Sequence, residues 1–89
     1  MDRILLSRRA VDDLRRVGPG PALDRLQEVL RRLARGELNL DVKPLVARAP
    51  WFRLRIGDWR VLYRPDDGRF LVARIVHRRE LRRAVRNLR

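Results

Sequence analysis

The chain has 89 residues with 45% apolar content, which fits one domain with a small hydrophobic core and is too apolar for a disordered protein. Its formal net charge of +12 indicates an anionic partner: nucleic acid, a membrane surface or an acidic protein. The absence of cysteine excludes disulfides, thiol catalysis and Cys-based zinc sites, and a single histidine excludes a histidine metal cluster. No apolar run approaches the ~20 residues that span a membrane, so we expect a soluble cytoplasmic protein without metal or cofactor.

The first half of the chain predicts a strand followed by two helices. Residues 3–6 form a short apolar run typical of a strand. Ser7 then offers an oxygen that can cap a helix, and Asp12 and Asp13 lie favourably near the start of that helix. A Gly/Pro corner at residues 18–21 separates it from a second helix. The apolar stripe of the second helix consists of Leu23, Leu26, Val29, Leu30 and Leu33.

Residues 51–64 predict two strands joined by a tight turn. Gly57-Asp58 suits a two-residue hairpin turn, because glycine accepts the positive φ that such turns require. With that turn, Arg55 faces Arg60 across the hairpin. Alternation along each strand then gives an apolar core face with Phe52, Leu54, Ile56, Trp59, Val61 and Tyr63. The opposite face carries Trp51, Arg53, Arg55, Arg60, Leu62 and Arg64.

The remaining segments complete the expected fold. Residues 37–50 lack periodicity and predict an irregular connection, whereas residues 65–68 (Pro-Asp-Asp-Gly) predict a turn rather than a catalytic carboxylate pair. Residues 70–76 predict a strand with a neighbour on each side, which places Phe70 near Tyr63 and Val72 near Val61. Residues 78–89 predict a short basic helix. The expected fold is therefore α+β in the order β-α-α-β-β-β-α, a single domain over residues 1–89. A small antiparallel twisted sheet carries two N-terminal helices and a short C-terminal helix.

Arg53, Arg55, Arg60 and Arg64 form the main candidate site. Like charges directly opposite one another destabilise a strand pair, so this face is interpreted as a phosphate-binding platform. A guanidinium fork binds phosphate oxygens bidentately and can stabilise charge that develops on a reacting phosphate. The alternative interpretation is a solvated outer face. Trp51 is expected either to stack on a base or to cover an edge of the sheet.

His77 is a second candidate, because histidine titrates near neutral pH and suits proton transfer. The strand pairing places it beside Trp59, at the end of the hairpin, where it could flank the arginine face. A structural role at the strand end is the alternative. The basic tail that follows is expected to bind RNA or an acidic peptide, or to be a solvated amphipathic helix.

The whole chain resembles the RelE/ParE toxin superfamily of type II toxin–antitoxin modules. The resemblance is carried by residues 7–14, by Val42-Lys43-Pro-Leu45, by the hairpin residues 52–63 with Asp66-Asp67-Gly68 after them, and by His77-Arg-Arg-Glu80. It implies a RelE-like fold. For the RelE branch it also implies an endoribonuclease, or mRNA interferase, that enters the ribosomal A site and cuts the codon there, with the ribose 2′-hydroxyl as the attacking group.

The resemblance also implies roles for individual residues. Arg53 and Arg55 correspond to the basic pair that grips the RNA, and Arg60 corresponds to the residue that stabilises the transition state. Arg78 or Arg79 corresponds to the arginine near the leaving group. Many RelE-like toxins have a tyrosine soon after this stretch; here Leu81-Arg82 stands in its place, so His77 takes the base role or turnover is weak. The expected catalytic set is Arg60, His77, Arg78 and Arg79, and the RNA-binding set is Lys43, Trp51, Arg53, Arg55 and Arg64.

The expected function is that of a toxin that inhibits translation as a ribosome-dependent mRNA endonuclease. Its expected partners are mRNA in the A site, ribosomal RNA and a cognate acidic antitoxin that folds on the toxin. Two alternatives stay open. One is a ParE-like toxin that poisons DNA gyrase without nuclease activity. The other is a catalytically weakened protein of this fold that only binds its antitoxin.

Overall fold

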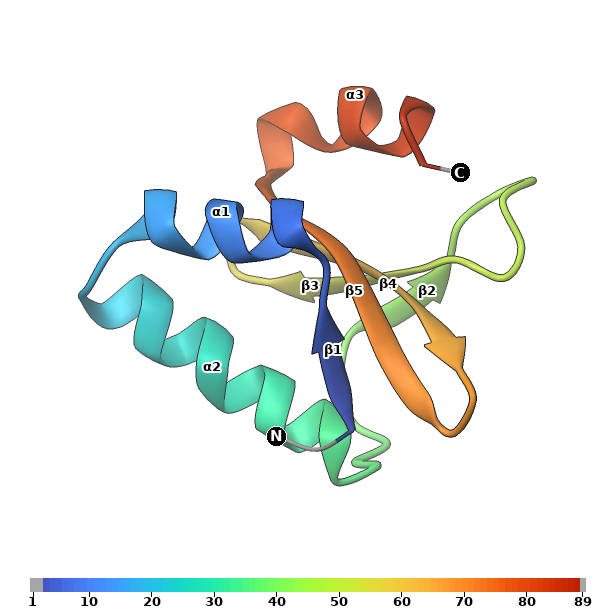
Figure 1. The fold of residues 1–89 in the computed structure, drawn as a ribbon, viewed down its shortest axis with the longest axis horizontal. Coiled ribbons are helices and arrows are strands. Elements are labelled where there is room, and N and C mark those ends of the chain that lie inside the picture. Colours follow the sequence, from blue (N-terminus) through green and yellow to red (C-terminus); the bar gives the residue numbers. More distant parts are fainter. Residues whose placement is uncertain (1–2, 89) are drawn as a thin grey trace.

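The computed structural model describes residues 3–88, which form one five-stranded sheet with helices on both faces (Figure 1). Its elements are β1 (Ile4–Leu6), α1 (Arg8–Val17), α2 (Pro21–Ala34), β2 (Val42–Pro44), β3 (Phe52–Ile56), β4 (Trp59–Asp66), β5 (Arg69–His77), a 3₁₀ turn (Arg78–Glu80) and α3 (Leu81–Arg86). The strand order is β1-β5-β4-β3-β2. The α+β class and the packing of the two N-terminal helices on the sheet are confirmed. Across residues 3–88 no helix is long and apolar enough to cross a membrane.

The sheet differs from the expected antiparallel arrangement at its two edges. β1 pairs with β5 in parallel, Leu5 opposite Leu71, so the sheet is mixed. β2 lies within the segment expected to be irregular and pairs with β3, Lys43 opposite Arg53. Three residues that include Pro44 carry no readable periodicity, and proline is compatible with an edge strand because its missing N–H faces away from the ladder. The sequence pattern therefore could not reveal this strand.

The β3–β4 hairpin has the predicted register. Arg55 lies opposite Arg60 and Ile56 opposite Trp59, and the turn between them places Gly57 at φ 59°. This pairing fixes which side chains share a face. The two chemically different faces of the hairpin are therefore confirmed.

The register between β4 and β5 differs from the prediction. Tyr63 lies opposite Val72, and Val61 lies opposite Ile75 rather than Val72. β4 runs through Pro65 to Asp66, so the turn is shorter than expected, and a register shift at Leu62/Tyr63 moves the pairing by one further residue. The Tyr63 and Phe70 rings still meet at 5.7 Å between centroids. The predicted proximity of these two rings is therefore confirmed, and the Val61–Val72 pairing is wrong.

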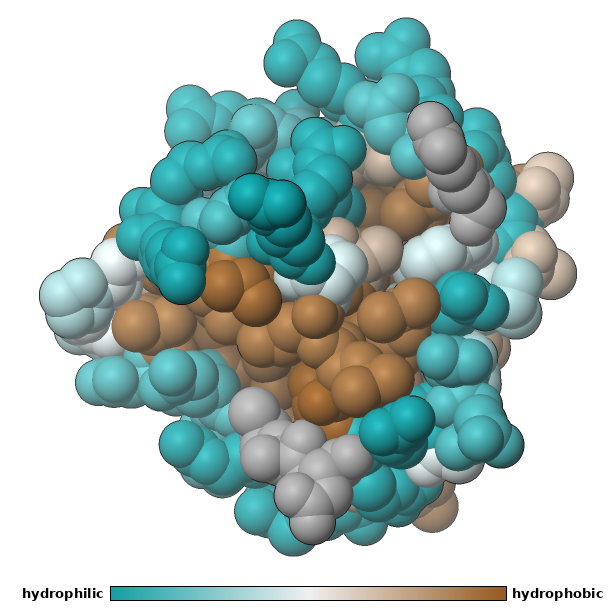
Figure 2. All heavy atoms as spheres, in the orientation of Figure 1, coloured by the Kyte–Doolittle hydropathy of each residue, from teal (hydrophilic) through white to brown (hydrophobic). Residues whose placement is uncertain are grey.

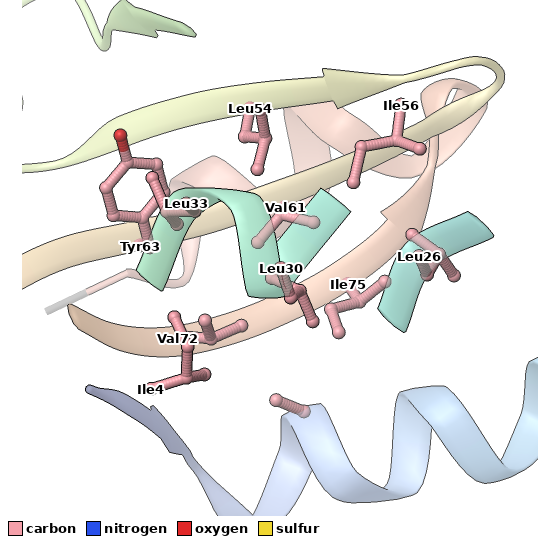
Figure 3. Packing of buried hydrophobic residues seen from close by; sticks show 11 residues of the cluster. Ile4, Leu26, Leu30, Leu33, Leu54, Ile56, Val61, Tyr63, Val72 and Ile75 are labelled. Atoms are coloured by element: carbon pink, nitrogen blue, oxygen red, sulfur yellow. The ribbon is translucent and has the colours of Figure 1, made fainter. Parts of the chain in front are cut away.

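Most of the core lies between the sheet and the two N-terminal helices (Figure 3). Its buried members from the helices and β1 are Ile4, Ala10, Leu26, Leu30 and Leu33, and those from β3, β4 and β5 are Leu54, Ile56, Val61, Tyr63, Val72 and Ile75. A second, smaller cluster lies on the other face of the sheet, where Leu62, Val76 and Ala84 are buried beneath α3. This second cluster matters for the site, because it covers part of the face that carries the arginines.

Leu30→Ala is expected to lower the free energy of unfolding by about 2–5 kcal/mol, because it leaves a cavity in the main core. Leu30 is 1% exposed. Leu38→Ala is the matched control, since Leu38 is 99% exposed, and its expected effect stays within about 0.5 kcal/mol. Urea unfolding of both variants measures the difference. Equal effects at the two positions would contradict the core described above.

Candidate nucleic-acid interface

Four arginines meet on the sheet face opposite α1 and α2. Arg53, Arg55 and Arg60 share this face because of strand alternation, and Arg55 lies directly opposite Arg60. Arg78 follows β5, and its backbone N–H donates to the carbonyl oxygen of Asp58 at 2.7 Å, which holds it at the β3–β4 turn. We call Arg53, Arg55, Arg60 and Arg78 the arginine cluster.

The charges of the arginine cluster act on one another. The pKa of Arg60 is lowered from its usual value, first by burial and then by the positive charges of Arg55, Arg53 and Arg78; Asp41 opposes this shift. An arginine stays protonated at any physiological pH, so the lowered pKa of Arg60 reflects the cost of burying its charge and, second, repulsion from the neighbouring arginines. A phosphate group bound among these side chains would relieve that repulsion. The electrostatics therefore favour an anionic ligand at the cluster.

The geometry of Arg60 suits a phosphate ligand. Its Nη1 donates to the carbonyl oxygens of Gly57 at 2.8 Å and Trp59 at 3.0 Å, which fixes the guanidinium at the hairpin turn. No hydrogen bond from its Nε or Nη2 to another of residues 3–88 is present. These two nitrogens form one edge of the guanidinium, the edge that binds two oxygens of a phosphate. The carbonyl groups of the hairpin turn thus orient Arg60, and the Nε–Nη2 edge of its guanidinium is left to bind phosphate.

Acidic side chains hold two other members of the cluster. Arg53 is only 15% exposed, and its Nη2 lies 3.7 Å from Oδ1 of Asp41. The Nε of Arg78 lies 3.5 Å from Oδ1 of Asp58 in an exposed pair. Lys43 adds a further charge, because it lies opposite Arg53 in the β2–β3 pairing and is exposed at the sheet edge. The predicted RNA-binding residues Lys43, Arg53 and Arg55 are therefore neighbours.

Trp51 and Arg64 are separated from the arginine cluster. Trp51 is 7% exposed, and the Arg64 guanidinium lies over its ring at 5.6 Å from the centroid. Burial leaves no open ring face for a base, so the structure supports the interpretation in which Trp51 covers the sheet. Between Arg60 and Arg64 on the same strand face lies Leu62, which is buried under α3. The continuous four-arginine platform expected from the hairpin is therefore divided in two.

His77 does not flank the arginine cluster. It pairs with Trp59, on the face that carries the main core, and the two rings meet edge-on at 5.7 Å. Its Nδ1 accepts hydrogen bonds from the backbone N–H and the Nε of Arg79, both at 3.2 Å. Both hydrogen bonds are accepted by the same ring nitrogen, so Nδ1 of His77 is engaged at the 3₁₀ turn rather than at the arginine cluster. His77 caps the 3₁₀ turn, and Arg79 is turned toward it, which leaves Arg78 as the arginine of this pair at the cluster.

Comparison with known proteins identifies the family. The ParE toxin of the type II toxin–antitoxin system parDE is the family whose pattern matches, over residues 4–82.

The chain belongs to the ParE toxin family.

Solved structures of toxins share the fold of this ParE-family toxin. The RelB–RelE antitoxin–toxin complex of Methanococcus jannaschii matches with a TM-score of 0.75 and 20% identity, over 90% of this chain and 96% of that one. The DinJ–YafQ complex of E. coli matches with a TM-score of 0.73 and 18% identity, over 88% and 94% of the two chains. The YoeB dimer of Staphylococcus aureus matches with a TM-score of 0.66 and 19% identity, over 81% and 91%. No curated protein sequence matches the chain. The protein is thus a type II toxin–antitoxin toxin of the RelE/ParE group.

The sequence of this ParE-family toxin does not predict the ion pair between Asp13 and Arg74. Asp13 is buried in α1 and accepts hydrogen bonds from Arg74 Nε at 2.9 Å, Arg74 Nη2 at 3.2 Å and the backbone N–H of Ile75 at 2.9 Å. The pKa of Arg74 is raised, chiefly by the hydrogen bond to Asp13. The expectation that Asp13 favours the start of its helix is wrong, because α1 begins at Arg8 and has no acidic residue in its first turn. Asp13 stands among the apolar positions of α1, and this position in the sequence is the feature that could have indicated a buried, paired carboxylate.

Proposed function

We propose that this ParE-family toxin is an mRNA endonuclease that acts at the ribosomal A site and binds the mRNA backbone with its arginine cluster. The convergence of Arg53, Arg55, Arg60 and Arg78 on one sheet face supports this proposal. Nucleic-acid affinity rests largely on neutralised phosphates. A bound polyanion neutralises all four positive charges at once. On a face that is only solvated, the repulsion between these arginines has no compensation.

In the proposed reaction, the ribose 2′-hydroxyl gives its proton to water as its oxygen bonds to the adjacent phosphorus. The bond from phosphorus to the 5′-oxygen breaks and that oxygen takes a proton from water, which leaves a 2′,3′-cyclic phosphate and a 5′-hydroxyl. Arg53, Arg55 and Lys43 hold the backbone, and the free edge of Arg60 binds the phosphate oxygens as negative charge develops. Arg78 lies at the same cluster and stabilises the leaving 5′-oxygen. These roles require positive charge and orientation, which the cluster provides.

No side chain of residues 3–88 stands free at the cluster as a base. Asp41 and Asp58 are paired with Arg53 and Arg78. Tyr63 lies in the core against Phe52, at 5.6 Å between ring centroids, and burial raises the pKa of its hydroxyl. We therefore expect slow cleavage that depends on positioning and on charge stabilisation.

The lack of a free base at the cluster among residues 3–88 favours a second candidate function. A ParE-like toxin that poisons DNA gyrase by protein contact needs no base, and the family pattern that matches carries the ParE name. The arginine cluster would then bind an acidic surface or DNA. Growth arrest with intact mRNA and with broken DNA distinguishes this function from the nuclease.

We also propose a cognate acidic antitoxin as partner. The matching structures of Methanococcus jannaschii and E. coli are toxin–antitoxin complexes. A toxin with a net charge of +12 attracts an acidic chain, and burial of the arginine cluster by that chain would block its substrate.

Inducible expression in a bacterium, with transcript ends mapped during growth arrest, tests the proposed function. Cuts at a fixed position within codons are expected for the wild type and should disappear for Arg60→Ala. Arg69→Ala is the matched control, because Arg69 is an exposed arginine at the start of β5, outside the cluster, and it should cut like the wild type. Arrest with unbroken transcripts would contradict the nuclease.

A further inference from the structure

A pocket of about 430 Å³ lies beneath α3, apart from the arginine cluster. It is bordered by the start of α1, by β4 and β5 and by α3. Apolar side chains form much of its lining, with Trp51, Leu71, Ala84 and Leu88 among them. Figure 2 shows apolar atoms recessed between α3 and the start of α1, with hydrophilic side chains around them.

The charged residues of this pocket are all arginines. Arg8, Arg9, Arg64 and Arg74 line it, and no aspartate or glutamate does so among residues 3–88. Arg74 has its counter-charge in Asp13. Arg8, Arg9 and Arg64 form no ion pair within the part of the chain that the structure describes. The pocket is therefore apolar inside and positively charged around its rim.

Arg64 provides the more specific signal. Its Nε is buried and has no hydrogen-bond acceptor among residues 3–88. Buried polar atoms are nearly always hydrogen-bonded. Burial of a cationic donor without an acceptor costs desolvation free energy that no hydrogen bond compensates. The guanidinium lies over Trp51, against the pocket. A ligand that brings a carboxylate into the pocket supplies the counter-charge that this guanidinium does not have among residues 3–88.

We propose that this pocket binds an acidic segment of a partner protein, with a large apolar side chain in the cavity and carboxylates on Arg64, Arg8 and Arg9. A protein segment fits better than RNA, because the hydrogen-bonding edges of a base would meet mostly apolar lining and lose their water partners. The class of partner rests on the acidic antitoxin of the proposed function. The pocket itself is a second docking point, separate from the face that binds mRNA.

Trp51 provides a local readout. The chain has two tryptophans, so a Trp59→Phe background leaves Trp51 as the sole indole. The probes are three short synthetic peptides with the same pattern: Leu at helical spacing with Glu elsewhere, Ser with Glu, and Leu with Gln. A short oligouridylate is the fourth probe. Each is titrated into the folded protein while the emission of Trp51 is followed.

The Leu/Glu peptide is expected to shift the Trp51 emission with saturation, and the other three probes to have little effect. Arg64→Gln and, independently, Arg9→Gln on the surface of α1 should each weaken that binding by roughly tenfold, the loss of one charge-assisted contact. Arg69→Gln, outside the pocket, should bind like the parent. Two variants are used so that a folding defect in one leaves the test intact.

Three outcomes would overturn the inference: no saturable shift with the Leu/Glu peptide, equal binding by the parent and both pocket variants, or a stronger shift with oligouridylate than with the peptide. The titration contains no ribosomes and no antitoxin. A failure here therefore leaves the cleavage proposal standing, and a toxin without nuclease activity can still bind the peptide.

Discussion

Asp13→Ala is expected to lower the free energy of unfolding by about 3–5 kcal/mol, because it leaves a partly buried arginine and a buried backbone donor without partners. β1 ends at Leu6, so the edge of β5 beyond Val72 has no strand beside it. Two side chains from the α1 region form hydrogen bonds to the backbone of β5 at this edge. Ser7 Oγ donates to the carbonyl oxygen of Ala73 at 2.7 Å, and Asp13 accepts the N–H of Ile75 at 2.9 Å. Removal of Asp13 opens this edge and also isolates the charge of Arg74.

Asp12→Ala is the matched control for Asp13→Ala. Asp12 is the neighbouring carboxylate on the same helix, half exposed, with Arg15 at 3.8 Å, and such surface pairs contribute about 0–1 kcal/mol. Chemical denaturation at neutral pH measures both. Asp13→Asn keeps one acceptor for Ile75 but loses the charge opposite Arg74, so its effect should lie between the two. A loss for Asp13→Ala no larger than that for Asp12→Ala would contradict the edge-capping role.

The second large effect is expected at the site. Arg60→Ala should slow cleavage of ribosome-bound mRNA by about 10²–10³-fold, the effect of removing one donor that stabilises developing charge. Arg60→Lys should recover part of that loss, because lysine keeps the charge but lacks the planar edge that binds two oxygens. Single-turnover cleavage on purified ribosomes gives the rates.

Arg25→Ala serves as the charge-matched control for these rates. Arg25 lies exposed on α2, a helix on the opposite face of the sheet from the arginine cluster, and its loss also lowers the net charge by one. Equal slowing by Arg25→Ala and Arg60→Ala would assign the effect to total charge. An Arg60→Ala rate equal to that of the wild type would remove Arg60 from the proposed site.

The hairpin could be predicted from the sequence because two local signals agree there. Gly57 fixes the turn, and the apolar alternation on either side of it fixes the register. The β4–β5 pairing had no such check. Pro65 and Gly68 both suggest a turn, and a two-residue slip keeps every side chain on the same face, so the pattern of apolar residues could not exclude it. Long-range pairings such as β1 with β5 depend on the helices between them and leave no local trace.

The sequence predicts which arginines share the face of the candidate site, but it does not predict how much of that face is covered. Strand alternation gave Arg53, Arg55 and Arg60 their common face. Leu62 on that same face was the one sign that something apolar would cover it, and α3 does so. His77 fits its prediction as a neighbour of Trp59, whereas the side of the sheet on which it lies depends on the end of β5. Asp13 and Arg74 are 61 residues apart, and their pairing exists only in the folded chain.

The most direct test of the proposed nuclease is the incubation of purified toxin with ribosomes that hold a defined codon of an mRNA in the A site. A cut within that codon is expected, dependent on the ribosome and absent when the same mRNA is free in solution. Intact mRNA on the ribosome, together with gyrase trapped on cleaved DNA in a parallel reaction, would contradict the proposed nuclease and assign the toxin to the gyrase-poisoning branch.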